Sequence, residues 1–366
     1  MRLFRAAAER YGYIVISSYQ TQSDGPIEPN DRAVNAMLND AQSRLSVDVH
    51  RFYFAGFSGT GRLAWNYGYS IPNNVAGLIE VGAGLPTPQL LLERNVARQA
   101  TPFAVFLSVG TTDFNYEEVR ALDAKLEAYG IRHHLEFFDG PHSWPPESVC
   151  ANALTWLQLQ AMRDGRLAVN KEWIDSVYLT TVSSIDSTER VDPYAAYLLY
   201  QQAGADFANL HDIKKVGDAA GKLAQSDAVK RTARRTSELA AESQTALERE
   251  DSFFEDFSRS GKPPAVDRIR STLELDELRN RARGSSDPLG ALAAKRELSS
   301  IFVRASFYEP RRYLAQGDTL KALTMYALAQ SIQPDNAQLC AERNELYRKY
   351  AVRKSVAAEL GCERRP

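Results

Sequence analysis

The sequence predicts an α/β domain over residues 1–165, followed by an all-α domain over residues 166–366. The first part of the chain alternates short apolar runs with helical patterns, which is typical of a mostly parallel sheet with helices on both faces. After about residue 194 the strand signals vanish, and residues of high helix propensity predominate. A chain of 366 residues is also long enough for two domains.

Five short apolar runs, rich in β-branched and aromatic residues, predict strands that are buried on both faces of the sheet. They cover residues 13–17, 51–56, 75–81, 103–109 and, more weakly, 134–138. Helical patterns follow at 116–129 and 149–162. In the first of these, Val119, Leu122 and Leu126 share one helix face.

The helical part is divided by two breaks that contain Gly and Pro, at 261–264 and 284–288. Its segment 298–350 resembles one degenerate tetratricopeptide repeat, which is a helical hairpin. The positions that match the second part of such a repeat are Tyr313, Ala322, Tyr326, Ala329 and Pro334. The first part does not match, because Ser306, Glu309 and Pro310 stand where Trp, Leu and Gly are usual. A single repeat must pack on neighbouring helices, and an ordinary helical hairpin is the alternative interpretation.

The composition argues against several classes of protein. A net charge of −2 gives no electrostatic basis for binding nucleic acid or an anionic membrane. No apolar run approaches the ~18 residues that an integral membrane segment needs. The three cysteines, at positions 150, 340 and 362, are widely spaced and form no CxxC motif. We therefore expect plain thiols rather than a disulfide framework or a zinc site.

A candidate nucleophile lies directly after the strand predicted at 51–56, where residues 56–61 read GFSGTG. A tight turn from strand to helix would lift the hydroxyl of Ser58 above the sheet. The same turn would direct the N–H of Gly59 toward the oxyanion of an acyl-transfer reaction. The fifth position of the usual G-x-S-x-G pattern holds Thr60, whose β-branched side chain is expected to crowd the turn.

The two partners of a catalytic triad follow in the order Ser, Asp, His. Asp113 comes after the strand at 103–109, in the sequence GTTDFN, and His142 after the strand at 134–138, in FDGPHSW. All three would meet at the carboxyl edge of the sheet, where His142 takes the proton of Ser58 and Asp113 orients the imidazole. The alternatives are that Asp113 only caps the following helix, or that Asp139 is the acid.

The three motifs, at 56–62, 110–113 and 140–144, resemble those of the α/β-hydrolase superfamily. The resemblance is strongest to bacterial esterases of the polyhydroxybutyrate-depolymerase, feruloyl-esterase and dienelactone-hydrolase type, and it covers under half of the chain. It implies a serine hydrolase that cleaves carboxylic esters through an acyl-enzyme intermediate, without metal or organic cofactor. A serine peptidase on the same fold is an alternative that the sequence does not distinguish.

The resemblance also implies that part of the sheet is missing. The strand order of the superfamily is 1-2-4-3-5-6-7-8, and residues 13–17 would be the fourth strand, but no segment fits the third. The loop after the third strand normally supplies the second oxyanion N–H. We expect an N-terminally truncated hydrolase domain rather than one that has lost these strands. Residues 1–10 carry no signal-peptide pattern, but an upstream region could, so the localisation is left open.

Three side chains on loops at the carboxyl edge are candidates for lining the substrate pocket, namely Tyr19, Gln20 and Trp144. For Trp144, packing of the histidine loop is an equally good interpretation. Residues 83–100 are too few for a large lid, so we expect a small or soluble ester substrate. A rival hypothesis is a catalytically degenerate hydrolase domain whose helical part binds a protein partner.

Overall fold

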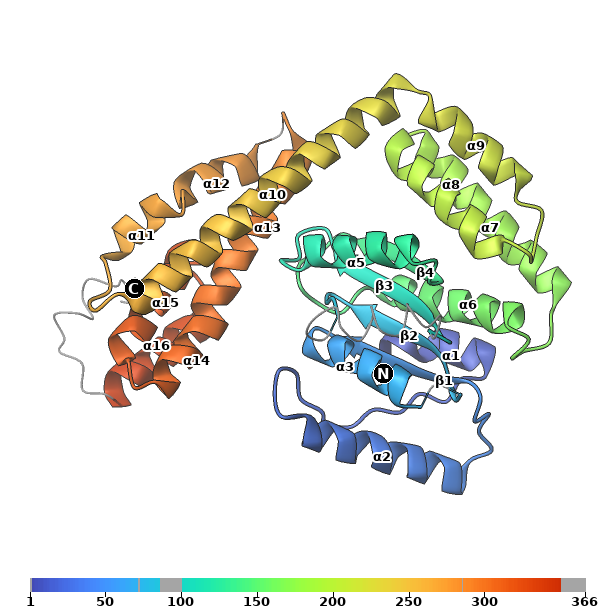
Figure 1. Cartoon of the computed structure of the whole chain (residues 1–366), viewed down its shortest axis with the longest axis horizontal. Coiled ribbons are helices and arrows are strands. Elements are labelled where there is room, and N and C mark those ends of the chain that lie inside the picture. Colours follow the sequence, from blue (N-terminus) through green and yellow to red (C-terminus); the bar gives the residue numbers. More distant parts are fainter. Residues whose placement is uncertain (1, 72, 86–100, 285, 350–366) are drawn as a thin grey trace. The chain divides into compact units, whose positions relative to one another are not determined.

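The computed structural model describes residues 2–71, 73–85, 101–284 and 286–349 (Figure 1). The chain forms two compact units, Met1–Arg235 and Thr236–Pro366. The first is a mixed α/β unit and the second is all-α, as the sequence predicts. Residues 86–100, which make up most of the segment expected to be too short for a lid, lie outside the described residues.

Four strands form one parallel sheet in the order β1-β2-β3-β4. They are β1 (Phe52–Phe57), β2 (Val75–Val81), β3 (Ala104–Gly110) and β4 (His133–Phe138). Every residue of β2 and β3 is buried, which confirms the interpretation of these continuous apolar runs as central strands. Because the strands are parallel, their carboxyl ends and the loops that follow lie at one edge of the sheet.

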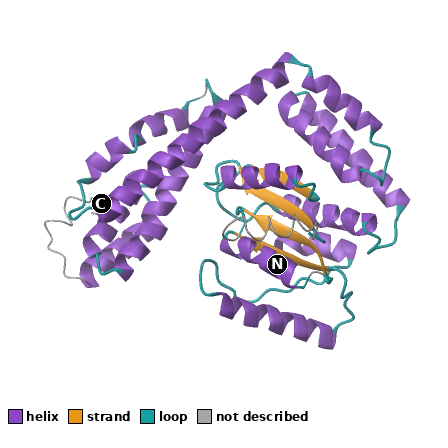
Figure 2. Ribbon diagram, in the orientation of Figure 1, coloured by secondary structure: helices purple, strands orange, loops and turns teal. Residues whose placement is uncertain are grey.

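Helices cover both faces of the sheet (Figure 2). A short 3-10 turn (Arg2–Phe4), α1 (Arg5–Tyr11) and α6 (Glu147–Arg163) pack on one face, around Phe106 and Trp156. Helices α3 (Gly59–Ser70) and α5 (Tyr116–Ala128) pack on the other face, around Trp65 and Leu107. Helix α2 (Ile27–Arg44) precedes β1. The two predicted helices of this part are thereby confirmed.

The strand expected at 13–17 is not formed. Ile14, Val15 and Ile16 are 49%, 37% and 45% exposed, although their sequence is typical of a buried strand. In the expected strand order another strand stands between this segment and β1; the described residues form no such strand, so the segment has no strand to pair with at its expected place. Only Tyr13 packs closely there, with its ring 5.4 Å from that of Tyr53.

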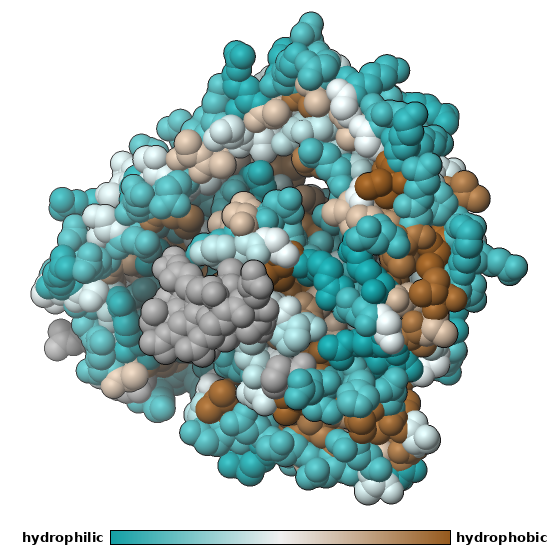
Figure 3. Space-filling model, turned by 45° about the vertical axis from the view of Figure 1, so that its right-hand side comes forward, coloured by the Kyte–Doolittle hydropathy of each residue, from teal (hydrophilic) through white to brown (hydrophobic). Residues whose placement is uncertain are grey.

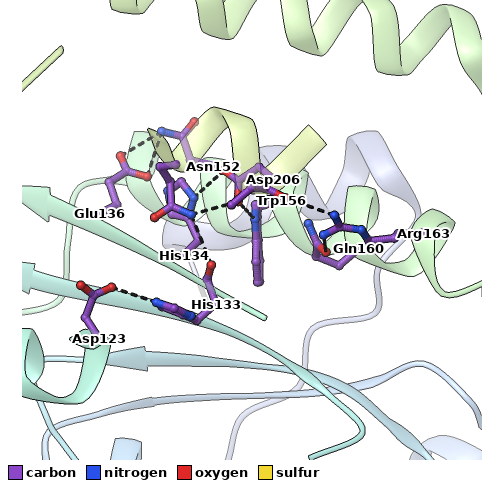
Figure 4. A network of polar contacts seen from close by, with 11 residues as sticks. Asp123, His133, His134, Glu136, Asn152, Trp156, Gln160, Arg163 and Asp206 are labelled. Carbon is purple, nitrogen blue, oxygen red and sulfur yellow. Dashed lines mark hydrogen bonds and ion pairs between the residues drawn. The ribbon is translucent and has the colours of Figure 1, made fainter. Parts of the chain in front are cut away.

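The first unit continues beyond the predicted boundary at residue 165, through α7 (Lys171–Glu189), α8 (Pro193–Phe207) and α9 (Lys214–Ala224). Asp206 of α8 fastens these helices to the sheet (Figure 4). Its carboxylate accepts hydrogen bonds from Trp156 Nε1 at 2.6 Å and from His134 Nδ1 at 2.9 Å. A buried acid with two partners from the sheet side holds α8 against the α/β core.

The second unit begins within α10 (Asp227–Arg259), a helix that spans the division between the units. It continues with α11 (Val266–Thr272), α12 (Leu275–Arg283), α13 (Pro288–Val303), a π-helical turn (Arg304–Tyr308), α14 (Glu309–Ala315), α15 (Thr319–Ile332) and α16 (Ala337–Lys349). Gly317, at φ 79°, and the helix cap Asp318 form the turn between α14 and α15. Helices α14 and α15 form a helical hairpin, with Tyr313, Ala322 and Ala329 in the core of the second unit.

The surface in Figure 3 is largely hydrophilic, with hydrophobic side chains gathered in separate patches. Exposed apolar side chains on the helices of the first unit include Leu179 and Leu198. Within the described residues, no helix has both the length and the apolar character that crossing a membrane requires.

Candidate active site

Ser58 occupies a strained turn between β1 and α3, with φ 55° and ψ −128°. A positive φ is unfavourable for a residue with a side chain and costs about 1–3 kcal/mol, so such residues often mark functional sites. The Ser58 N–H donates to the carbonyl oxygen of Val81 at 2.9 Å, which anchors the turn to β2. A Cβ on Gly56 would lie 2.2 Å from the carbonyl oxygen of Thr60, so only glycine fits there. A tight, strained turn from strand to helix is the geometry that a nucleophile elbow requires.

Thr60 stabilises this turn instead of crowding it. Its hydroxyl donates a hydrogen bond to the carbonyl oxygen of Phe57 at 2.8 Å. The same hydroxyl oxygen accepts a hydrogen bond from the backbone N–H of Phe57, at an N···O distance of 3.0 Å. The close approach of helix and strand falls on Gly61, where an added Cβ would lie 3.2 Å from the Gly56 carbonyl oxygen. A threonine at the fifth position is therefore compatible with the elbow.

Asp113 and His142 form a hydrogen-bonded pair in which Asp113 is buried and His142 is partly exposed. Both carboxylate oxygens of Asp113 lie 2.9 Å from Nδ1 of His142, and Asp113 is 0% exposed. Oδ1 of Asp113 also accepts the N–H of Asn115 at 2.8 Å. The carboxylate of Asp113 thus faces the imidazole of His142. The N-cap residue of α5 is Asn115 and not Asp113. Asp139, the other candidate acid, lies 3.3 Å from the Thr111 hydroxyl.

The loops that carry these two residues are joined by hydrogen bonds. The N–H and the hydroxyl of Thr112 donate to the carbonyl oxygen of Gly140 at 3.0 and 2.9 Å. A Cβ on Gly110 would lie 2.4 Å from that same oxygen, so glycine is required for the two loops to approach. These contacts hold the loop of Asp113 and the loop of His142 against each other.

Sequence reasoning missed two supporting residues, Gly82 and Asn115. Gly82 has φ 58°, and a Cβ there would lie 2.8 Å from Oδ2 of Asp113 and 3.2 Å from Nδ1 of His142. The side-chain amide of Asn115 donates to the Gly82 carbonyl oxygen at 2.8 Å. The available signal was the position of Gly82 directly after β2, which pairs with the strand that leads to Ser58.

Two phenylalanines flank the imidazole of His142. The ring centroids of Phe57 and Phe114 lie 4.5 and 4.3 Å from that of His142. Because Phe57 immediately precedes Ser58, this contact brings the imidazole to the nucleophile elbow. Within the described residues, the Ser58 hydroxyl and His142 form no hydrogen bond. Such bonds are often long without substrate and tighten when it binds.

The predicted pocket-lining residues differ in position. Trp144 is 38% exposed and packs 5.9 Å from the ring of Phe57, so it belongs to the histidine loop cluster. Tyr19 is fully exposed, and the N–H of Gln20 donates to Ser18 Oγ within the same loop. Hydrogen bonds and ring contacts thus bring Trp144, but neither Tyr19 nor Gln20, to the Asp113–His142 pair.

The N–H of Gly59 is free to act as an oxyanion donor, since no described residue accepts it. Beside it lies Asp24, whose backbone N would be 2.7 Å from a Cβ on Gly59. The N–H of Asp24 also lacks a hydrogen-bond partner in the described part of the chain. Two unpaired backbone donors therefore lie close together at the start of α3.

Among the described residues, no group of three or more His, Cys, Asp or Glu side chains could hold a metal ion. Cys150 is buried, and burial raises the pKa of its thiol to about 12. Comparisons of the chain with models of protein families, with curated proteins and with solved structures found no match.

Proposed function

We propose that the chain is a serine hydrolase that cleaves carboxylic esters through an acyl-enzyme intermediate. The observation that carries the proposal is the pairing of the buried Asp113 with His142, in which both carboxylate oxygens lie 2.9 Å from Nδ1. Beside that pair lies Ser58, held at φ 55°. A charged imidazole needs such a carboxylate, and a strained serine between strand and helix is typical of an acyl-transfer nucleophile.

In the proposed reaction, Nδ1–H of His142 donates to Asp113, which leaves Nε2 to take the proton of Ser58. The serine oxygen then attacks the carbonyl carbon, and the carbonyl oxygen becomes an oxyanion that the Gly59 N–H stabilises. The neighbouring Asp24 N–H is a candidate for the second donor. The imidazolium returns its proton to the departing alkoxide, and water repeats the sequence to release the acid. No step needs a metal or an organic cofactor.

Labelling with a neutral fluorophosphonate tests the proposal, because this probe reacts with activated serines. The intact chain and the control variant Ser43→Ala, which removes an exposed hydroxyl at the end of α2, should be labelled. The variant Ser58→Ala should not. A folded chain that resists labelling would contradict an active esterase. Comparing matched ester and amide substrates would then separate an esterase from a serine peptidase.

The second candidate function is protein binding by a hydrolase domain that no longer catalyses. It is favoured by two features of the described residues: Ser58 and His142 form no hydrogen bond, and no strand lies on the outer side of β1. The all-α unit, with a hairpin (α14–α15) that we propose is tetratricopeptide-like, would hold the partner. This candidate predicts no labelling of the intact chain.

A further inference from the structure

The carboxylate of Asp24 lies against the residue that follows the proposed nucleophile. A Cβ on Gly59 would lie 2.6 Å from Oδ1 of Asp24. Asp24 itself has φ 55°, a conformation that residues with a side chain rarely adopt. Only because Gly59 lacks a side chain can this carboxylate stand at the first turn of α3.

A buried amide braces the loop that carries Asp24. Asn30 is 1% exposed, and its side chain accepts the N–H of Gln22 at 2.8 Å while donating to the Gln22 carbonyl oxygen at 3.0 Å. The same amide lies 3.5 Å from the carbonyl oxygen of Pro26. These contacts hold both ends of the turn at 22–26, so the carboxylate is presented from an ordered loop.

No basic side chain of the described residues neutralises Asp24, which is exposed and forms no ion pair there. Arg62, on the first turn of α3, pairs with Glu118 at 2.8 Å. The imidazolium that His142 becomes in the proposed reaction is paired with Asp113, whose carboxylate lies 2.9 Å from Nδ1. Among the described residues, the carboxylate of Asp24 therefore stands beside the proposed nucleophile without a cationic partner.

This charge affects the proposed reaction directly. Attack by Ser58 creates a second negative charge, on the oxyanion beside the Gly59 N–H. Two like charges this close repel each other, whereas a cation on the substrate would neutralise the carboxylate. We infer that Asp24 selects esters that carry an ammonium-type cation a few bonds from the scissile carbonyl. The inference rests on the proposed function and names its substrate class.

Two isosteric pairs of esters test this inference on the full chain, since each pair differs only in N⁺ against C. On the alcohol side the pair is choline acetate and 3,3-dimethylbutyl acetate. On the acyl side it is the p-nitrophenyl esters of trimethylammonioacetate and 3,3-dimethylbutyrate. The variant is Asp24→Asn, which retains the backbone N–H and tolerates a positive φ. The control is Glu28→Gln, an exposed acid on the first turn of α2.

For each ester, kcat/KM of the intact chain is divided by kcat/KM of the variant. The intrinsic reactivity of the ester cancels in this ratio. For at least one pair, Asp24→Asn should lower kcat/KM about tenfold for the cationic ester and raise it for the neutral one. Glu28→Gln should change neither ester. A shift of less than about twofold in the cationic-to-neutral ratio, in both pairs, would overturn the inference.

Ser58-dependent turnover of the neutral esters would still support the proposed function. Absence of both turnover and fluorophosphonate labelling in the folded chain overturns both.

Discussion

Asp113 presents both of its carboxylate oxygens to Nδ1 of His142, at 2.9 Å, while its side chain is wholly shielded from solvent. A carboxylate this deeply buried is stable only when its hydrogen bonds are satisfied. The imidazole of His142 and the N–H of Asn115 satisfy them. The hydrogen bonds hold Asp113 and His142 together, and separating the two residues would leave a buried carboxylate without its imidazole partner.

Asp113→Asn should abolish most of the activity while preserving the fold. The amide can still accept the N–H of Asn115, but it leaves the imidazole in the wrong tautomer, which lowers kcat by about 10⁴ in comparable triads. Initial rates with p-nitrophenyl acetate measure the effect, and circular dichroism checks the fold. Asp139→Asn is the matched control and should retain nearly full activity. Equal losses in the two variants would contradict the assignment of Asp113 as the acid.

Gly82→Ala should reduce activity more than stability. Its Cβ would meet Oδ2 of Asp113 at 2.8 Å and push the carboxylate away from His142. Gly130→Ala is the control, because Gly130 has φ 64° but nothing within 4 Å of an added Cβ. Both variants should lose about 1 kcal/mol of unfolding free energy from backbone strain. Only Gly82→Ala should lose kcat, and an unchanged kcat would show that the contact does not position the acid.

Thr60→Val should destabilise the first unit by about 1–2 kcal/mol, since it removes the hydroxyl that bonds both the N–H and the carbonyl oxygen of Phe57. Urea unfolding measures the difference. Thr180→Val provides the comparison, because that exposed hydroxyl bonds only to the Ser176 carbonyl oxygen within α7. Its effect should stay below about 0.5 kcal/mol. If the two variants unfolded alike, the bridging role of Thr60 would be refuted.

The attachment of α8 should weaken at alkaline pH. Burial alone would lower the pKa of His134, but the Asp206 carboxylate outweighs it, and the pKa lies above its usual value. Glu136 and Asp123 act in the same direction as Asp206. A raised folded-state pKa means that the ion pair contributes fully below about pH 6.5 and is lost as the pH rises through the folded value.

Asp206→Asn measures this contribution (Figure 4). The variant should cost about 1–2 kcal/mol more unfolding free energy at about pH 6 than at about pH 9. Urea titrations of both proteins at the two pH values give the comparison. A cost that is the same at both would mean that His134 stays neutral in the folded chain.

The fold was predictable wherever the pattern of one segment determines its environment. The runs that became β2 and β3 are apolar throughout because both of their faces are covered, and burial on two faces is visible in the sequence itself. Asp113 and His142 could be paired in advance, since the carboxyl ends of parallel strands meet at one edge.

Other features depend on contacts that no single segment encodes. Residues 13–17 have the sequence of a strand, but a strand forms only beside a partner. Asp24 could not be placed beside Gly59, because the position of a loop depends on long-range packing. The continuation of the first unit to Arg235 likewise depends on long-range contacts, such as the bonds of Asp206 to β4 and α6 and the packing of α7–α9 on Leu159 and Met162.

The outer side of β1 has a consequence for the protein in solution. Even-numbered residues such as Phe52 direct their N–H groups to β2, so those of Tyr53 and Ala55 point away, and no described residue accepts them. Exposed strand edges are templates for edge-to-edge aggregation. Slow precipitation at high concentration, rather than a low melting temperature, should therefore limit storage of the purified chain, and a lysine at Ala55 should lengthen its shelf life.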